Sequence, residues 1–120
     1  MEEAGIPQSL SSQCRGVGAI SYFMELSRGL YPEIQFVYDL QIPNDFKPQN
    51  TDGEVGAFYH LTLNEVLEKI RNNEFKPNCA LITIDFLIRH GHISPENELD
   101  YVEIVAGCHK NLFDLEQFLN

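Results

Sequence analysis

Two apolar stretches joined by a short polar segment constrain the fold of this chain most. Residues 33–42 place apolar side chains at every second position, which is the period of a half-buried strand. This apolar set is Ile34, Phe36, Tyr38, Leu40 and Ile42. Residues 17–26 are apolar on both alternating sets, which is typical of a strand buried on two sides. Gly29 and Pro32 between them indicate a turn, so we predict an antiparallel hairpin.

The segment after the hairpin predicts a loop, one more strand and a helix. Residues 43–53 are rich in Pro, Asn and Asp, which is a loop composition, and residues 56–61 are expected to form a short strand. Thr62 and Glu65 have the spacing of a capping box, with apolar residues at helical spacing behind them. We therefore expect a helix after Thr62, with an ion pair between Glu65 and Lys69 on its exposed side.

A second helix is predicted from about Pro77 to Gly91. Pro suits the first helical turn, basic residues suit the last turn, and Gly suits the position after the end. Nearly all faces of this segment are apolar, so we expect it to be the most buried element. From Asp100 onward the pattern predicts one or two short helices interrupted at Gly107. This order of elements predicts an α+β domain with a mixed or antiparallel sheet.

Size and charge limit the classes of function. The 120 residues suffice for one domain with its own core. The net charge of −10 argues against nucleic-acid binding, but it allows a small phosphorylated substrate where a divalent cation reverses the local charge. No run approaches the roughly 18 apolar residues of a membrane span, and the acidic N-terminus does not resemble a signal peptide. Three cysteines, an odd number, indicate reduced thiols and a cytoplasmic location.

The N-terminal residues MEEAGI contain two adjacent glutamates in a known arrangement. Residues 2–6 match E-E-x-G-U, the end of the Nudix box G-x5-E-x7-R-E-U-x-E-E-x-G-U, where U is aliphatic. The longer segments ISYFMELSRGLYPEIQFVYDL, DGEVGAFYHLTLNEV and FKPNCALITIDFLIRHG resemble the thiamin pyrophosphokinase-related subgroup of the Nudix hydrolases. The resemblance covers roughly residues 2–105, in the order expected after the box.

This resemblance implies a single partial Nudix domain over residues 1–120. Its fold would be an incomplete α/β/α sandwich with a mixed or antiparallel sheet and C-terminal helices. Its activity would be that of a metal-dependent pyrophosphohydrolase acting on thiamin diphosphate or its oxidised analogues to give the monophosphate. Glu2 and Glu3 would bind Mg²⁺ or Mn²⁺, since hard cations prefer carboxylate oxygens. Glu54 would be a catalytic base or a further ligand, and Asp52 is a weaker candidate for that role.

The front of the box would precede Met1, together with one metal ligand, the usual base and an arginine. We therefore expect a truncated chain with weak activity or none. The alternative is a non-catalytic Nudix-like module that binds a ligand or a partner, with a homo-oligomer covering the exposed sheet edge. A third alternative is a small α+β protein whose motifs match by chance, which the three long segments argue against.

Three other groups of residues have side chains with functional chemistry. His90 and His92 form an H-x-H pair at the predicted helix end, where capping or a surface position is favoured over metal binding. Cys79 has no neighbouring base and is expected to be a small core residue rather than a nucleophile. Arg28 and Lys47 lie in predicted loops, where each is either a contact for a diphosphate or an ordinary surface cation.

Overall fold

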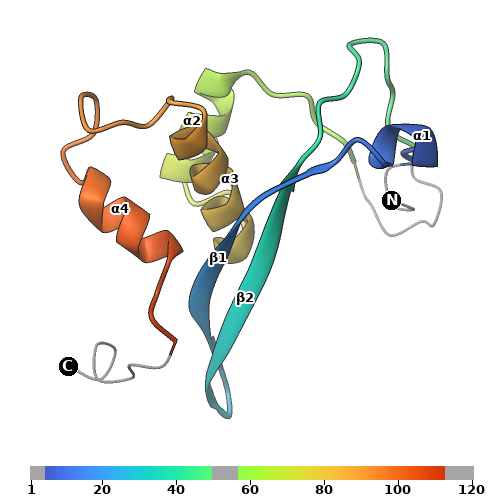
Figure 1. Ribbon diagram of the computed structural model, residues 1–120. Coiled ribbons are helices and arrows are strands. Elements are labelled where there is room, and N and C mark those ends of the chain that lie inside the picture. Colours follow the sequence, from blue (N-terminus) through green and yellow to red (C-terminus); the bar gives the residue numbers. More distant parts are fainter. Residues whose placement is uncertain (1–4, 50–56, 113–120) are drawn as a thin grey trace.

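The computed structural model describes residues 5–49 and 57–112, and Figure 1 shows the order of its elements. They are helix α1 (Gln8–Ser11), strands β1 (Arg15–Leu26) and β2 (Gly29–Asp39), and helices α2 (Leu63–Arg71), α3 (Pro77–Arg89) and α4 (Tyr101–Cys108). The two strands form an antiparallel sheet, and α3 and α4 pack against β1. This arrangement confirms the predicted α+β class and is consistent with part of a Nudix-like fold.

The predicted hairpin is confirmed, but its turn is shorter than expected. Leu26 pairs with Gly29, so only Ser27 and Arg28 lie in the turn. Pro32, which was assigned to the turn, lies within β2 opposite Phe23. Proline has no N–H to donate to a ladder, so it fits a strand whose outer edge is unpaired. Among the described residues no strand pairs with that edge of β2.

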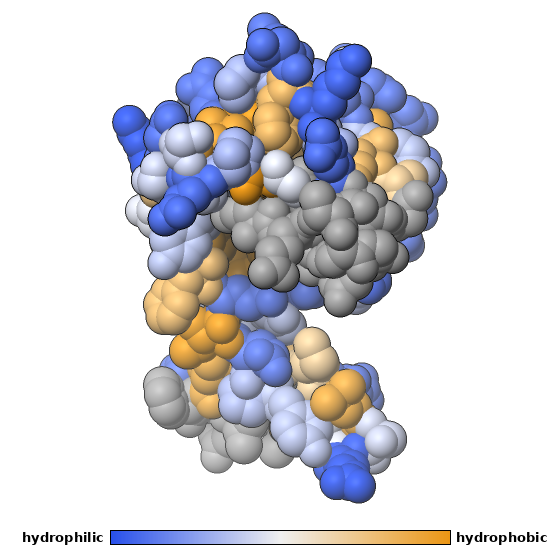
Figure 2. Space-filling model, turned by 90° about the vertical axis from the view of Figure 1, so that its right-hand side faces the viewer, coloured by the Kyte–Doolittle hydropathy of each residue, from blue (hydrophilic) through white to orange (hydrophobic). Residues whose placement is uncertain are grey.

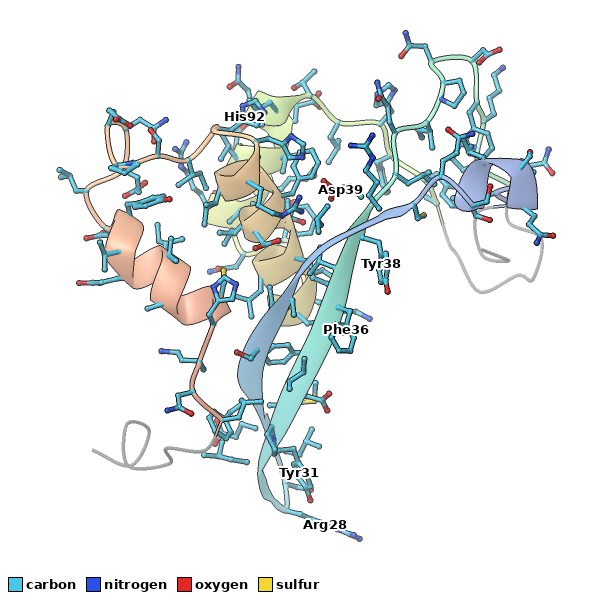
Figure 3. All side chains as sticks on the ribbon, viewed as in Figure 1. Arg28, Tyr31, Phe36, Tyr38, Asp39 and His92 are labelled. Atoms are coloured by element: carbon cyan, nitrogen blue, oxygen red, sulfur yellow. The ribbon has the colours of Figure 1, made fainter. Side chains whose placement is uncertain are left out.

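The apolar face of β2 is not the buried one, which corrects the expectation for this strand. Val37 is buried, and Glu33, Gln35 and Asp39 on the same side are partly covered. The predicted apolar set points the other way, and Phe36 is 75% exposed. Figure 3 shows Phe36 and Tyr38 projecting away from the helices. The helices pack on one side of the sheet only, and their position decides which set is covered.

The core of the described residues lies between the hairpin and α3 and α4. Ile20 and Cys108 are fully buried, and Val37 packs in the same cluster. Burial raises the pKa of the Cys108 thiol, with a further contribution from the charge of Asp85. Beyond α4 the chain returns to β1, where the Lys110 amide donates to the carbonyl oxygen of Ser21 at 3.0 Å. The end of α4 is thereby fixed to β1.

Helix α2 begins as predicted. The Thr62 hydroxyl accepts from the Glu65 amide at 3.3 Å, and a Glu65 carboxylate oxygen accepts from the Thr62 amide at 3.0 Å. These two bonds complete the capping box. The expected Glu65–Lys69 ion pair is wrong, because the Glu65 carboxylate is used at the cap. Lys69 instead pairs with Glu74 at 3.5 Å.

Helix α3 agrees with its prediction, whereas the short strand expected before α2 is not formed. Pro77 opens α3, His90 follows its last residue, and Gly91 has a φ of +77°, as expected after a helix end. Helix α4 ends at Cys108, one residue after Gly107, close to the interruption that the sequence predicted. Residues 57–61 form no strand, since among the described residues no ladder partner lies beside them. None of the helices in the described ranges combines the length and the apolar content that spanning a bilayer requires.

Candidate functional site

A polar pocket of about 580 Å³ lies where β1 begins, β2 ends and α3 terminates. It is lined by Gln13, Arg15, Val17, Asp39, Gln41, Arg89 and His90. The antiparallel pairing of the strands places Arg15 directly opposite Asp39. Helix α3 brings Arg89 and His90 to the same place from residues about fifty positions further along the chain. The pocket therefore depends on tertiary packing.

Arg89 is the centre of this pocket's hydrogen-bond network. Its Nη1 and Nη2 atoms donate to the two carboxylate oxygens of Asp39 at 2.7 and 3.0 Å. Its Nε atom donates to Asp85 Oδ2 at 2.8 Å, one turn earlier on α3. A planar guanidinium suits such two-point pairing with a carboxylate. The network joins the end of β2 to the last turn of α3.

This network joins two carboxylates to one guanidinium, and the pairing shifts the pKa values of Asp39 and Arg89. The hydrogen bonds from Arg89 hold the pKa of Asp39 down at about 2, although partial burial opposes this shift. The carboxylates of Asp39 and Asp85 in turn raise the pKa of Arg89. A carboxylate with so low a pKa is a poor general base near neutral pH. Asp39 therefore has the character of a structural anchor.

His90 extends the network at the end of α3. Its Nε2 atom lies 3.0 Å from Asp39 Oδ2, and its ring lies 4.1 Å from the ring of Phe86. Asp39 thus ties the helix end to the sheet through Arg89, the last residue of α3, and through His90, which follows it. His92 is exposed and lines a different pocket, beside α2, so the structure does not bring the H-x-H pair together as two ligands. The preference for a role at the helix end is confirmed for His90.

The pocket is suited to an anion more than to a metal ion. Arg89 already occupies the carboxylates of Asp39 and Asp85, which are thus not free to bind a cation. Arg15 has no ion-pair partner within the described ranges, and the amides of Gln13 and Gln41 stand on the same walls. Residues 5–49 and 57–112 contain no group of three acidic, histidine or cysteine side chains that could hold a metal.

The predicted metal ligands Glu2 and Glu3, and the candidates Asp52 and Glu54, lie outside the described residues. Their nearest described neighbours in the sequence do approach one another. Gly5 has a φ of +65°, and a Cβ atom built on it would lie 3.0 Å from Gln49 Cβ. A side chain at position 5 would therefore be strained by both its backbone angle and its neighbour. Glycine allows this close approach of the two segments.

The remaining candidate residues lie away from the pocket. Cys79 is exposed in the first turn of α3, so the expectation of a core position is wrong. It precedes the part of α3 that packs on the sheet, which begins near Leu81. Arg28 is in the hairpin turn, at the opposite end of β2 from Asp39 (Figure 3). Lys47 is exposed in the loop after β2.

The Asp39–Arg89–Asp85 network was missed from the sequence. The four-residue spacing of Asp85 and Arg89 on a predicted helix was a usable signal for one of its ion pairs. Asp39 carried no such signal, since it belonged to the polar set of a strand that was expected to face solvent.

Most of this chain is similar in sequence to parts of longer proteins, two of which are named Nudix hydrolases. No family model matches the sequence. The chain is 42% identical to Nudix hydrolase 20, chloroplastic, of Arabidopsis thaliana and 43% identical to Nudix hydrolase 24, chloroplastic, of the same plant, in each case over 80% of its length. These similarities support the Nudix superfamily. This chain is also 41% identical, over 93% of its length, to the uncharacterized protein YJR142W of Saccharomyces cerevisiae.

The similar regions are only parts of those relatives. The chain spans 36% of the yeast protein and 26% and 27% of the two plant hydrolases.

Proposed function

We propose that this chain contributes part of the active site of a Nudix-type pyrophosphohydrolase. The observation that supports this most is the 42–43% identity to two plant Nudix hydrolases over 80% of the chain. The proposed substrate is thiamin diphosphate or one of its oxidised analogues, and the product is the monophosphate. This narrower assignment rests on the subgroup resemblance of the three long sequence segments.

The proposed metal ligands have the right chemistry for Mg²⁺ or Mn²⁺. Glu2 and Glu3 offer carboxylate oxygens, which these hard cations prefer, whereas both carboxylate oxygens of Asp39 in the pocket accept hydrogen bonds from Arg89. When bound, the cation supplies positive charge that offsets the diphosphate. We assign Glu54 to accept a proton from the water that attacks phosphorus as the bridging P–O bond breaks.

The close approach of Gly5 and Gln49 supports this assignment. Glu3 is two residues from Gly5, and Glu54 is five residues from Gln49. Extended chains of those lengths reach at most roughly 7 and 18 Å. Connectivity therefore permits the two glutamates to meet at one substrate. We assign the Arg15 guanidinium, which lines the pocket, to bind a phosphate oxygen of the substrate.

Monophosphate release from thiamin diphosphate and from its oxidised analogues, with Mg²⁺ or Mn²⁺, tests the proposal. We expect weak turnover, because these 120 residues hold only the last two glutamates of the box. Glu3→Gln and Glu54→Gln are expected to abolish it, whereas the exposed Glu96→Gln is the matched control. Release that is unchanged in both glutamate variants would contradict the assignment. Turnover as high as that of the full-length Arabidopsis thaliana Nudix hydrolase 20 would show that the rest of the box is not needed.

A second candidate function is binding without catalysis, and the exposed apolar side of the hairpin favours it. Titration calorimetry with thiamin diphosphate separates the two candidates, since a binding module gives heat of binding without monophosphate release.

A small phosphorylated ligand and no nucleic acid remain our expectation for partners, and the cytoplasm remains the proposed location. The two plant relatives are described as chloroplastic.

A further inference from the structure

A small pocket with aromatic walls lies between the loop that follows β2 and the segment that leads into α2. Its volume is about 220 Å³, and the rings of Phe46, Phe58 and Tyr59 line it together with Ile42. We call it the aromatic pocket. In Figure 1 both segments lie at the end of the molecule that carries α1. Figure 2 views that side, and hydrophobic side chains are set among hydrophilic ones on its broad upper part.

The aromatic side chains of this pocket are open to solvent instead of filling a core. Tyr59 is 80% exposed and Phe58 is 39% exposed, whereas Phe46 is partly buried. Open aromatic faces can stack on another flat ring, as they do on the bases of single-stranded nucleic acids. The walls of the pocket therefore suit a flat aromatic ligand.

The aromatic pocket also has polar groups among its lining residues. Asn44 and His60 line it, and neither side chain has a hydrogen-bond partner among residues 5–49 and 57–112. A side-chain amide offers both a donor and an acceptor, and a neutral imidazole offers one of each. Such groups suit the nitrogen atoms and amino groups at the edge of a heteroaromatic ring. Apolar walls with a few polar groups are typical of sites for small molecules.

The charge of the pocket excludes an anionic occupant. Among the described residues that line it there is no acidic, lysine or arginine side chain. A phosphate group placed there would lose water without gaining a cation, which is unfavourable. A positively charged ring is accepted, because the faces of aromatic side chains attract cations. The net charge of −10 on the whole chain acts in the same direction.

The aromatic pocket is large enough for a ring but small for a complete ligand. A cavity of about 150 Å³ can hold benzene, whereas complete ligand sites commonly have about 300 Å³ or more. The rest of the ligand can extend into the polar pocket of Arg15, because Gln41 of that pocket is the chain neighbour of Ile42. A third hollow, beside α1, shares Phe46 with the aromatic pocket and Gln13 with the polar pocket.

We propose that the aromatic pocket binds the heteroaromatic ring of the substrate, while the phosphate end of the same molecule lies at Arg15. The ring is flat, is uncharged or positively charged, and has nitrogen at its edge. Tyr59 stacks on its face, and Asn44 and His60 bind its edge. The place of the phosphate end rests on the proposed function, whereas the ring site rests on the aromatic pocket itself.

Titration calorimetry of the 120-residue chain with two separate probes tests the proposal. Thiamin carries the rings without a phosphate, and inorganic diphosphate carries phosphates without a ring. Tyr59→Ala is expected to raise the thiamin dissociation constant about tenfold, equivalent to about 1.4 kcal/mol, which is within the range of one aromatic stacking contact. It should leave diphosphate binding unchanged. Arg15→Ala should weaken diphosphate binding and leave thiamin binding nearly unchanged.

Two further variants are the controls for Tyr59→Ala. Tyr31→Ala makes the same substitution on β2 near the hairpin turn, at the opposite end of the hairpin from the loop after β2 (Figure 3), and should not affect either probe. Tyr59→Phe keeps the ring and should bind thiamin nearly as the wild type does. Circular dichroism of Tyr59→Ala should show the wild-type fold, since this side chain is mostly exposed.

Three outcomes would overturn the ring site. They are a wild-type chain that does not bind thiamin, a Tyr59→Ala variant that binds thiamin as tightly as Tyr31→Ala does, and an Arg15→Ala variant that loses thiamin binding as strongly as Tyr59→Ala does. Each places the ring outside the aromatic pocket.

The hydrolysis assay separates a failure of the ring site from a failure of the proposed function. Thiamin binding that depends on Tyr59, without monophosphate release from thiamin diphosphate, supports the ring site and contradicts the proposed function. Monophosphate release with the same KM in the wild type and in Tyr59→Ala contradicts the ring site alone.

Discussion

The two faces of the β1–β2 hairpin show that burial here does not follow residue polarity. The inner face buries Ile20 and Val37 but also takes in Gln35 and Asp39. The outer face leaves large apolar side chains such as Phe36 in solvent. Since both faces belong to the same two strands, the difference comes from the helices, which lie on one side only. The side chains of a strand point alternately to its two faces and so form two sets. The position of the neighbouring helix layer determines which of these sets is buried.

The polar residues of the inner face are tolerated because they have partners. Asp39 is bonded at both carboxylate oxygens by Arg89, which also holds the buried Asp85. A buried charge without such partners would cost several kcal/mol. Gln35 is the exception, since its buried Oε1 atom has no hydrogen-bond partner among the described atoms. The inner face therefore contains both paired charged groups and a buried acceptor that has no partner among the described atoms.

The largest expected effect is a difference in unfolding free energy when isoleucine is replaced by alanine on the inner face and on the outer face. Ile20→Ala removes a fully buried side chain and is expected to cost about 3–4 kcal/mol of unfolding free energy. Ile34→Ala, at a residue that is 54% exposed, is expected to cost less than about 1 kcal/mol. Urea unfolding of both variants measures the two values. Equal costs would show that the outer face is covered within one copy.

Loss of the guanidinium should be the next largest effect. Arg89→Ala removes the shared partner of the Asp39 and Asp85 carboxylates, and Asp85 is only 6% exposed. We expect a loss of about 2–3 kcal/mol, below the value for a fully buried pair because Arg89 is partly exposed. Arg28→Ala in the hairpin turn is the control and should change stability by less than about 0.5 kcal/mol. A loss below about 1 kcal/mol for Arg89→Ala would mean that the network is not stabilising.

Low pH should reduce the stability that Asp39 contributes at the end of the hairpin. The pKa of Asp39 is lowered in the folded chain from 3.8 to about 2, so its ionised form stabilises the fold. This contribution is fully present above about pH 4 and is lost as the pH falls through about 2. Its size is about 1–2 kcal/mol once partial exposure is allowed for. Stability curves of the wild type and Asp39→Asn should converge over that interval, and parallel curves would contradict the assignment.

The smallest predicted effect is a gain in stability. Gln35→Met keeps the length of the side chain and removes the buried oxygen that has no described partner. We expect stability to rise by about 0.5–1 kcal/mol, because an unsatisfied buried acceptor is removed from the inner face. Gln41→Met, at an exposed residue, is the control and should leave stability nearly unchanged. A loss of stability in Gln35→Met would indicate that the oxygen is hydrogen-bonded in solution.

Local patterns predicted the local parts of this structure. The hairpin, the capping box of Thr62 and Glu65, and helix α3 with Gly91 after its end all follow from short-range spacing. The Glu65–Lys69 ion pair and the strand at 56–61 were wrong. The first failed because the Glu65 carboxylate has a competing partner at the cap. The second failed because a strand needs a ladder partner, which no local pattern provides.

The candidate site was less predictable than the fold. Glu2, Glu3 and Glu54 came from motif and family resemblance, and they stay predictions because they lie outside the described residues. The Asp39–Arg89 pair joins residues fifty positions apart, so its formation depends on how α3 packs against the hairpin. The four-residue spacing of Asp85 and Arg89 marked only one of the two ion pairs of that network.

The sequence by itself determined the two alternating sets of β2, the ends of the helices and the resemblance to Nudix hydrolases. Tertiary structure alone decided that Val37 and Asp39 face the helices while Phe36 and Tyr38 face outward. The physical reason is that the side chains of a strand alternate with a period of two whichever of the two sets becomes buried. The choice depends on where α3 and α4 lie, and those helices begin only at Pro77 and Tyr101, well beyond the end of β2 at Asp39.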